Sequence, residues 1–141
     1  MSRSGPMPEG RTLVPGDGHG RALVLSEPLS FWGGLDPATG AIIDVHHPQL
    51  GAVVTGMVLV MPGGRGSSSS SSVLAEAIRA GTAPAAIVLS EADPIIALGA
   101  LVARELYGAA LPVVVLETSD IRTGAELGLS ADRRGAHLET G

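Results

Sequence analysis

The chain has 141 residues, enough for one domain with a substantial hydrophobic core. Hydrophobic residues make up 45% of the sequence and charged residues 16%, a balance that excludes an intrinsically disordered chain. The formal net charge is −5 and there is one residue each of Phe, Trp and Tyr. Nucleic acid is therefore not expected as a partner, because its phosphates repel negative charge and its unpaired bases need aromatic rings to stack on.

The sequence contains no cysteine, so this chain supplies no disulfide, no thiol nucleophile and no thiolate ligand for zinc or an iron–sulfur cluster. Its first ten residues lack the apolar core of a signal peptide, and no apolar run approaches the ~20 residues that span a bilayer. We therefore expect a cytoplasmic protein that does not associate with membranes.

Residues 1–9 are rich in Pro, Gly and Ser and are expected to form a flexible tail before a single domain of residues 10–141. The stretch GDGHG at residues 16–20 resembles a dinucleotide fingerprint, but Arg21 replaces the required third glycine and the stretch precedes a strand. It is predicted to be a loop.

The rest of the first half is predicted to be all-β. Short apolar runs predict strands within residues 21–31 and over residues 41–45. Between them, the motif FWGG at residues 31–34 contains two glycines, Gly33 and Gly34, which allow a ligand or a partner chain to approach the backbone closely. The competing interpretation is a packed aromatic residue before a turn.

Asp44, His46 and His47 form the most polar titratable cluster of this half. Adjacent histidines point to different sides and lack the i,i+4 spacing of a metal pair, so no metal site is predicted. His19 and His137 are expected to face solvent.

The second half alternates strands with helices, which predicts parallel pairing with helices packed on the sheet. A charged turn at residues 132–135 between two apolar runs predicts a final hairpin. Glu76 and Arg79 are expected to form a weak surface pair. The predicted elements are a strand at 57–61, a short helix ending before Gly81, a strand at 85–89, a helix from Pro94 to about Tyr107 with Asp93 as its cap, and a strand within 111–117.

The sequence GGRGSSSSSS at residues 63–72 lies between the first of these strands and the first helix, where connections are normally short. A flexible linker joins two separate units, whereas this run lies between one strand and one helix of a single small domain. Serines cap helices, and glycines before a helix let its free N–H groups approach an anion. Arg65 and Ser67, two residues apart, project to the same side of an extended chain. The run is therefore either a capped helix start with surface serines or an anion-binding loop.

Several motifs resemble, in the same order, the small subunit of the aconitase X family, its swivelling domain. They are FWGGLDPATGAIID, a following HP, GRGSSSSS, GTAPAAIVLSEADPI and PVV. The resemblance covers the chain from about Gly10 onward. It implies an α/β fold with a β-barrel-like part and a parallel βαβ part, in which the serine loop lies at a strand-to-helix turn.

The resemblance also implies a hydro-lyase whose cysteine-bearing large subunit ligates an iron–sulfur cluster, while the small subunit closes over a small carboxylate substrate. The serine that follows Arg-Gly, Ser67, is the implied catalytic base. Many relatives read Gly-Ser-x-Thr-Gly-Ser after the arginine, whereas this chain has serine throughout. The residues expected to bind substrate are Arg65, Gly66, Ser68, Gly33 and Gly34.

Members of this family dehydrate either cis-3-hydroxy-L-proline or phosphomevalonate. A phosphate calls for additional cations. This chain has no lysine, which favours hydroxyproline. An alternative of another class is a non-enzymatic anion-binding or interaction module that uses the same loop.

Overall fold

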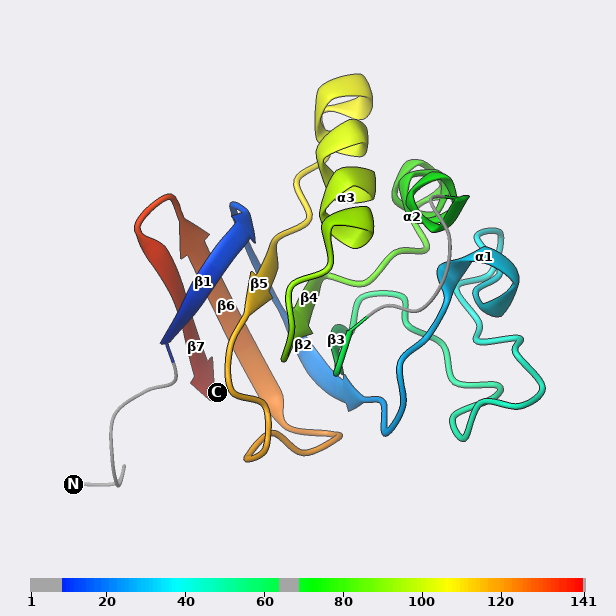
Figure 1. Cartoon of the computed structure of the whole chain (residues 1–141), viewed down its shortest axis with the longest axis horizontal. Coiled ribbons are helices and arrows are strands. Elements are labelled where there is room, and N and C mark those ends of the chain that lie inside the picture. The colour runs from blue at the N-terminus through cyan, green and yellow to red at the C-terminus, as the bar shows by residue number, and fades with distance from the viewer. Residues whose placement is uncertain (1–8, 64–68, 141) are drawn as a thin grey trace.

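The computed structural model describes residues 9–63 and 69–140. Within these ranges the strands close into a barrel in the order β1-β5-β4-β3-β2-β6-β7, and helices pack beside it (Figure 1). This arrangement confirms the predicted α/β fold with a barrel-like part and a parallel part. The strands are β1 Glu9–Val14, β2 Gly16–Val24, β3 Val58–Met61, β4 Ala86–Leu89, β5 Val113–Val115, β6 Glu126–Asp132 and β7 Gly135–Thr140. The helices are α1 Phe31–Gly34, α2 Ser69–Ala80 and α3 Pro94–Tyr107.

The parallel half of the barrel consists of β2, β3, β4 and β5. Every residue of β3 and of β4 is buried, because each strand has the barrel interior on one face and helices on the other. Since α2 connects β3 to β4 and α3 connects β4 to β5, the carboxyl ends of these strands lie at one edge of the sheet. The parallel pairing predicted from the sequence is confirmed.

The antiparallel half contains the predicted hairpin. Asp132 of β6 pairs with Gly135 of β7, and its Oδ1 accepts hydrogen bonds from the backbone N–H groups of Arg134 at 2.8 Å and Gly135 at 3.2 Å. Burial alternates along β6, as expected where one face of a strand lines the barrel and the other meets solvent. β1 closes the barrel by pairing with both β5 and β7.

Two hydrophobic cores lie on opposite faces of the parallel strands. In β3, Val58 and Val60 belong to the cluster that fills the barrel, whereas Leu59 and Met61 belong to the cluster under the helices. This division explains why the strands read as continuous apolar runs. Further members of the barrel core are Ala22, Ala86, Val88, Val114, Leu127, Leu129, Ala136 and Leu138. Further members of the helix core are Ile87, Leu89, Leu74, Ala77, Ile96 and Ala100.

Helix α3 begins and ends where the sequence predicts. The Oδ1 atom of Asp93 accepts a 2.9 Å hydrogen bond from the backbone N–H of Ile95, and Gly108 ends the helix with a φ of 68°. α3 packs closely on α2, since a Cβ atom on Gly99 would lie 2.7 Å from the backbone oxygen of Ser71. None of the helices in the described ranges has both the length and the apolar character needed to cross a bilayer.

The prediction of a loop at residues 16–20 is wrong, because this stretch forms the first half of β2. Its glycines alternate with exposed polar residues and point towards the amino ends of β3 and β4. A Cβ atom on Gly18 would lie 2.4 Å from the backbone oxygen of Ala85, and one on Gly20 would lie 2.4 Å from that of Gly56. Only glycine fits where the two halves of the barrel approach this closely.

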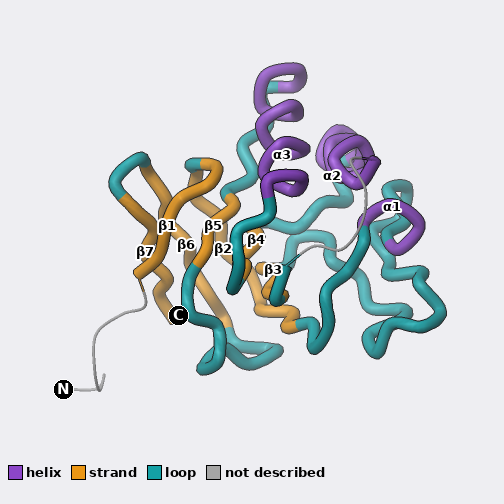
Figure 2. Tube along the Cα trace, in the orientation of Figure 1, coloured by secondary structure: helices purple, strands orange, loops and turns teal. Residues whose placement is uncertain are grey.

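The predicted strand at residues 41–45 is also wrong. The segment forms only isolated bridges, Leu35 to Ile42 and Ala41 to Val53. Figure 2 shows the chain between α1 and β3 as loop. Closely spaced turns interrupt the segment, including glycines with positive φ at residues 40 and 51, so no partner strand of useful length forms. The all-β prediction for the first half also missed the single-turn helix α1.

Candidate functional site

The serine run joins the end of β3 to the start of α2. Gly63 is the last described residue after β3, and α2 begins at Ser69, so serines build the first turn of the helix. The prediction that part of the run forms the helix start is confirmed. Because both ends belong to one domain, the run is not a linker between domains. The predicted site residues that lie outside the described ranges are Arg65, Gly66, Ser67 and Ser68.

The end of β4 holds the chain that leads into this run. The backbone oxygen of Pro62 accepts hydrogen bonds from the Ser90 hydroxyl at 3.0 Å and from the Glu91 N–H at 3.1 Å. The backbone oxygen of Met61 accepts a further bond from the Ser90 N–H at 3.2 Å. These bonds fix the direction in which the chain leaves the sheet, and the missing N–H of Pro62 ends the strand there.

The start of α2 is anchored to α1 by Ser70. The Ser70 side chain is buried, and its Oγ accepts a 3.2 Å hydrogen bond from the backbone N–H of Trp32. The Ser30 hydroxyl lies 3.5 Å from the Ser70 hydroxyl and donates to the backbone oxygen of Trp32 at 3.0 Å. Because an N–H group in a partly buried site needs an acceptor, these contacts fix α1 against the first turn of α2.

Sequence reasoning did not single out Ser70. The signal that could have found it is the helical period, since Ser70 lies four residues before Leu74 and seven before Ala77, and all three are buried. Nothing in the residue type distinguishes the buried serine from its exposed neighbours. Its partner, the backbone N–H of Trp32, is far away in sequence and carries no sequence signal at all.

The structure brings the FWGG motif beside the helix start. Phe31 is buried, whereas the side chain of Trp32 is 61% exposed. Gly33 has a φ of 78° and open space around its Cβ position, but a Cβ on Gly34 would lie 3.0 Å from the Cδ1 atom of Leu29. The interpretation of a packed aromatic residue therefore holds for Phe31 and fails for Trp32. Substrate binding by Gly33 and Gly34 stays a prediction.

The cluster at Asp44, His46 and His47 forms local hydrogen bonds. The Oδ1 atom of Asp44 accepts from the His46 N–H at 2.9 Å. His47 is buried, and its Nδ1 accepts from the Gln49 N–H at 3.0 Å, so its Nε2 carries the proton and donates to the backbone oxygen of Glu27 at 3.2 Å. Both ring nitrogens are thus engaged. Over residues 9–63 and 69–140, no group of three His, Cys, Asp or Glu side chains is placed to hold a metal ion.

Two described arginines are each paired with a glutamate. On α2, Arg79 Nε donates to Glu76 Oε1 at 2.8 Å, which confirms the predicted pair and lowers the pKa of the Glu76 carboxyl. On the barrel, Arg21 Nε lies 3.8 Å from Glu126 Oε1. Since all four side chains are largely exposed, these pairs stabilise the fold only weakly.

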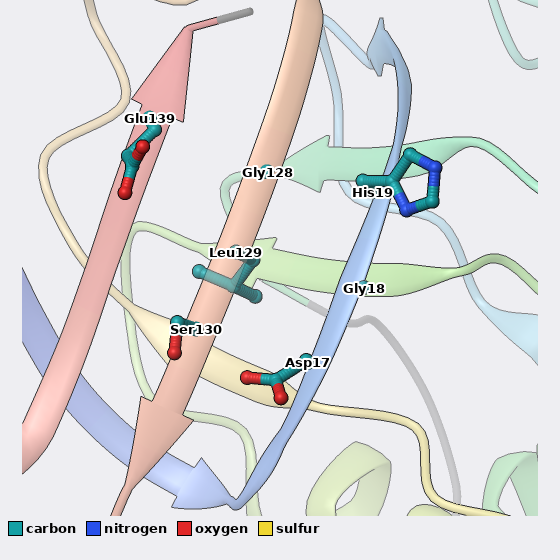
Figure 3. Close-up of a pocket in the computed structure, with 7 residues that line it drawn as sticks. All are labelled: Asp17, Gly18, His19, Gly128, Leu129, Ser130 and Glu139. Carbon is teal, nitrogen blue, oxygen red and sulfur yellow. The ribbon is translucent and has the colours of Figure 1, made fainter.

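A shallow groove of about 380 Å³ lies on the outer face of the antiparallel half. Figure 3 shows Asp17 and His19 on β2 and Glu139 on β7, with Gly128 and Ser130 on the intervening β6. His19 is exposed there, as predicted, and so is His137. The helices lie elsewhere on the molecule (Figure 1), and none of the residues that line the groove is a predicted site residue.

The predicted loop therefore starts at the carboxyl end of β3 and finishes at the amino end of α2. Ligands of α/β sheets bind at the carboxyl ends of parallel strands, and the amino end of a helix favours negative charge. A closed α/β barrel with a loop rich in glycine and serine at this edge is the architecture of a swivelling domain of the aconitase type. More narrowly, the chain belongs to the aconitase X swivel domain family, whose model matches residues 7–138. The resemblance drawn from the sequence is confirmed.

Named relatives fall into two groups. The chain is 54% identical over 106 residues to a cis-3-hydroxy-L-proline dehydratase of Pseudomonas aeruginosa, and this match covers 75% of the chain. It is 40% identical over 132 residues to a phosphomevalonate dehydratase small subunit of Thermococcus sibiricus, covering 93% of the chain and 97% of the relative. The chain spans 18% and 19% of the lengths of two hydroxyproline dehydratases that it matches.

A solved structure agrees with the fold. The chain superposes on the holo-form of aconitase X from Thermococcus kodakaraensis with a TM-score of 0.85 and 34% identity, covering 96% of this chain and 99% of the other.

The residues of this chain do not fit an iron–sulfur cluster. Such clusters are held mainly by cysteine thiolates, and the sequence has no cysteine. The chain therefore supplies no thiolate ligand for such a cluster.

Proposed function

We propose that the chain is the small subunit of an aconitase X hydro-lyase, and that it dehydrates cis-3-hydroxy-L-proline in the cytoplasm together with a cysteine-bearing large subunit. The observation that carries the proposal is the position of the glycine- and serine-rich loop between β3 and α2, in a chain of the swivel domain family. The identity of 54% to the Pseudomonas enzyme supports hydroxyproline as the substrate.

In the proposed mechanism, Ser67 acts as the general base. Its alkoxide removes the proton from the carbon next to the substrate carboxylate, and the C–O bond on the neighbouring carbon breaks. The departing hydroxide and the abstracted proton together make up the water that is released. Arg65 and nearby backbone N–H groups stabilise the alkoxide or the substrate carboxylate, with Gly66, Ser68, Gly33 and Gly34 as further contacts. The iron–sulfur cluster belongs to the large subunit, and no step assigned to this chain passes through it.

The charges of the chain support hydroxyproline over a phosphorylated substrate. Phosphomevalonate carries roughly two more negative charges than hydroxyproline, and a phosphate is normally bound by several cations. The chain has no lysine, and Arg21 and Arg79 are already paired with glutamates. Within the serine run itself Arg65 is the one cation, so this chain offers few positive charges to a phosphate bound at that loop.

Phosphomevalonate is the second candidate substrate, and two observations favour it. The match to the small subunit of Thermococcus sibiricus covers nearly the whole of both chains. In addition, Arg122 lies in the connection after β5, next to Thr123, whose Oγ1 accepts a 2.9 Å hydrogen bond from the N–H of Val24 at the carboxyl end of β2. An arginine at this edge is suitably placed to bind a phosphate. A non-enzymatic anion-binding module is the alternative of another class.

The test begins with co-purification. A tagged copy of the chain, expressed with its neighbouring genes, is expected to retain a large cysteine-bearing chain. The complex is then given each substrate separately. Formation of a pyrroline carboxylate from cis-3-hydroxy-L-proline supports the proposal, and turnover of phosphomevalonate alone contradicts the choice of substrate. A chain that retains no partner and catalyses no dehydration is a binding module instead.

The catalytic serine is tested in the same complex. Ser67→Ala is expected to lower turnover by about 100-fold or more without weakening assembly, because a general base acts in the transition state. Ser72→Ala, an exposed serine on α2, is the matched control and should keep normal turnover. Normal turnover of Ser67→Ala combined with loss in Ser68→Ala would move the assignment by one residue.

A further inference from the structure

The segment from α1 to β3 exposes an unusual number of large apolar side chains. Trp32 is 61% exposed and Val45 is 72% exposed. Surface patches of this kind on a folded domain mark sites where another molecule docks. We call this set of residues the apolar face: Trp32, Ile43, Val45, Leu50 and Val53.

Backbone contacts bring Ile43 and Val53 close to the α1 turn that carries Trp32. The N–H of Ile43 donates to the backbone oxygen of Gly34 at 2.8 Å, which places Ile43 beside the α1 turn. Ala41 bridges Val53 in antiparallel fashion, which places Val53 beside the segment that carries Ile43. In Figure 1 this segment, coloured cyan to green, folds beside α1 and α2 and away from the β6–β7 hairpin.

The apolar face is also depleted of charge. Residues 31–53 contain only two acidic residues, Asp36 and Asp44, and no arginine. Neither carboxyl group is fully exposed, and each accepts a 2.9 Å hydrogen bond from a nearby backbone N–H. Apolar side chains are exposed on α3 as well, but Arg104 and Glu105 stand among them. Protein interfaces are depleted of charge at their centre and enriched in tryptophan, which is the composition of the apolar face.

The relatives indicate the occupant. This chain corresponds to less than a fifth of the hydroxyproline dehydratases and to nearly all of a relative named as a small subunit. The remaining four fifths of the enzyme must therefore contact this domain somewhere. The hydrogen bond between Trp32 and Ser70 connects the apolar face directly to the start of α2. A partner that covers Trp32 thus lies next to the first turn of α2, where the serine run ends.

We propose that the apolar face is the surface on which this chain docks to the large subunit, and that the partner meets it with an uncharged, apolar surface. The inference rests on the proposed function, because it takes the large subunit as the occupant. Docking there buries Trp32 and sets the position of the serine run relative to the partner through the contact between Ser70 and α1.

The test introduces a charge into the apolar face. Val45→Glu and Val53→Glu are compared with Ser130→Glu, an exposed change on β6 far from α1. Circular dichroism and thermal melting verify that each variant is folded. Affinity for the purified large subunit is then measured by titration. We expect each valine variant to bind at least about tenfold more weakly than wild type, because an unpaired carboxylate would be buried, and the control to bind normally. Excess large subunit should restore turnover.

Three outcomes overturn the inference. Folded valine variants that bind the large subunit as tightly as wild type show that the partner docks elsewhere. An isolated chain that dimerises, and becomes monomeric in Val45→Glu without losing affinity for the large subunit, assigns the face to a second copy. A wild-type chain that binds no large subunit overturns the proposed function itself. The first two results leave the activity of the complex intact, so failure of the inference and failure of the function are distinguishable.

Discussion

Substitution of Ser70 by alanine should destabilise the domain by a predictable amount. The change removes the acceptor of the Trp32 N–H, whose hydrogen bond to Ser70 Oγ measures 3.2 Å in a partly buried site. Leaving a buried donor unpaired costs about 1–3 kcal/mol, and partial exposure places this case at about 1–2 kcal/mol. Alanine returns roughly 0.5 kcal/mol through its higher helix propensity. The net loss is about 1 kcal/mol, or a fall in Tm of about 3 °C.

Ser72→Ala is the matched control, because it makes the same change of residue type on the same helix at an exposed position. Thermal melts of the isolated domain should place the control at or above wild type and Ser70→Ala below it. The reasoning predicts in addition that amide hydrogen exchange speeds up at Trp32 in Ser70→Ala alone. If both variants melt at one temperature with wild-type exchange at Trp32, the hydrogen bond does not anchor α1.

Two further predictions concern the barrel and its acid stability. Gly18→Ala should destabilise the fold by about 1–3 kcal/mol in denaturant titration, because its Cβ would lie 2.4 Å from the backbone oxygen of Ala85. Gly128→Ala is the control and should leave stability unchanged, because nothing lies within 4 Å of its Cβ position. Equal denaturation midpoints for the two variants would contradict this explanation. Hydrogen bonds from Ser119 hold the pKa of Glu117 below its usual 4.5, so its stabilisation is present above pH 4.5 and is lost as the pH falls through the lower folded pKa. Glu117→Gln should flatten this acid limb of the stability curve, and an unchanged limb would rule the effect out.

The parallel half could be predicted from the sequence because its signals are local. Asp93 and Gly108 are residue types that favour the start and the end of a helix, and they mark the ends of α3. Strands buried on both faces are recognisable in the sequence as continuous apolar runs. The first half of β2 was missed because glycine usually marks turns, whereas here Gly18 and Gly20 meet the interior of the barrel. Glycine is required at these positions only because the barrel closes and brings β2 close to the backbone of Ala85 and Gly56.

The candidate site likewise has features that local sequence signals predict and features that depend on contacts between distant residues. The start of α2 within the serine run was foreseeable from capping preferences and strand-to-helix connection lengths. The pairing of Ser70 with the N–H of Trp32 joins residues far apart in sequence, and a backbone N–H has no side-chain signature. The exposure of Trp32 was equally hidden, since an aromatic residue in an apolar motif is normally taken as core.

The pairing of β1 with β7 places the two ends of the described chain next to each other, with Glu9 opposite His137. An additional polypeptide can therefore continue from either end and leave the molecule at the same place. Such an extension would begin on the barrel side, away from α1 and α2 (Figure 1). A larger chain can thus be joined at either end on the barrel side, away from the start of α2. This geometry agrees with a family in which the match covers a small part of one long relative and nearly all of another that is named as a small subunit.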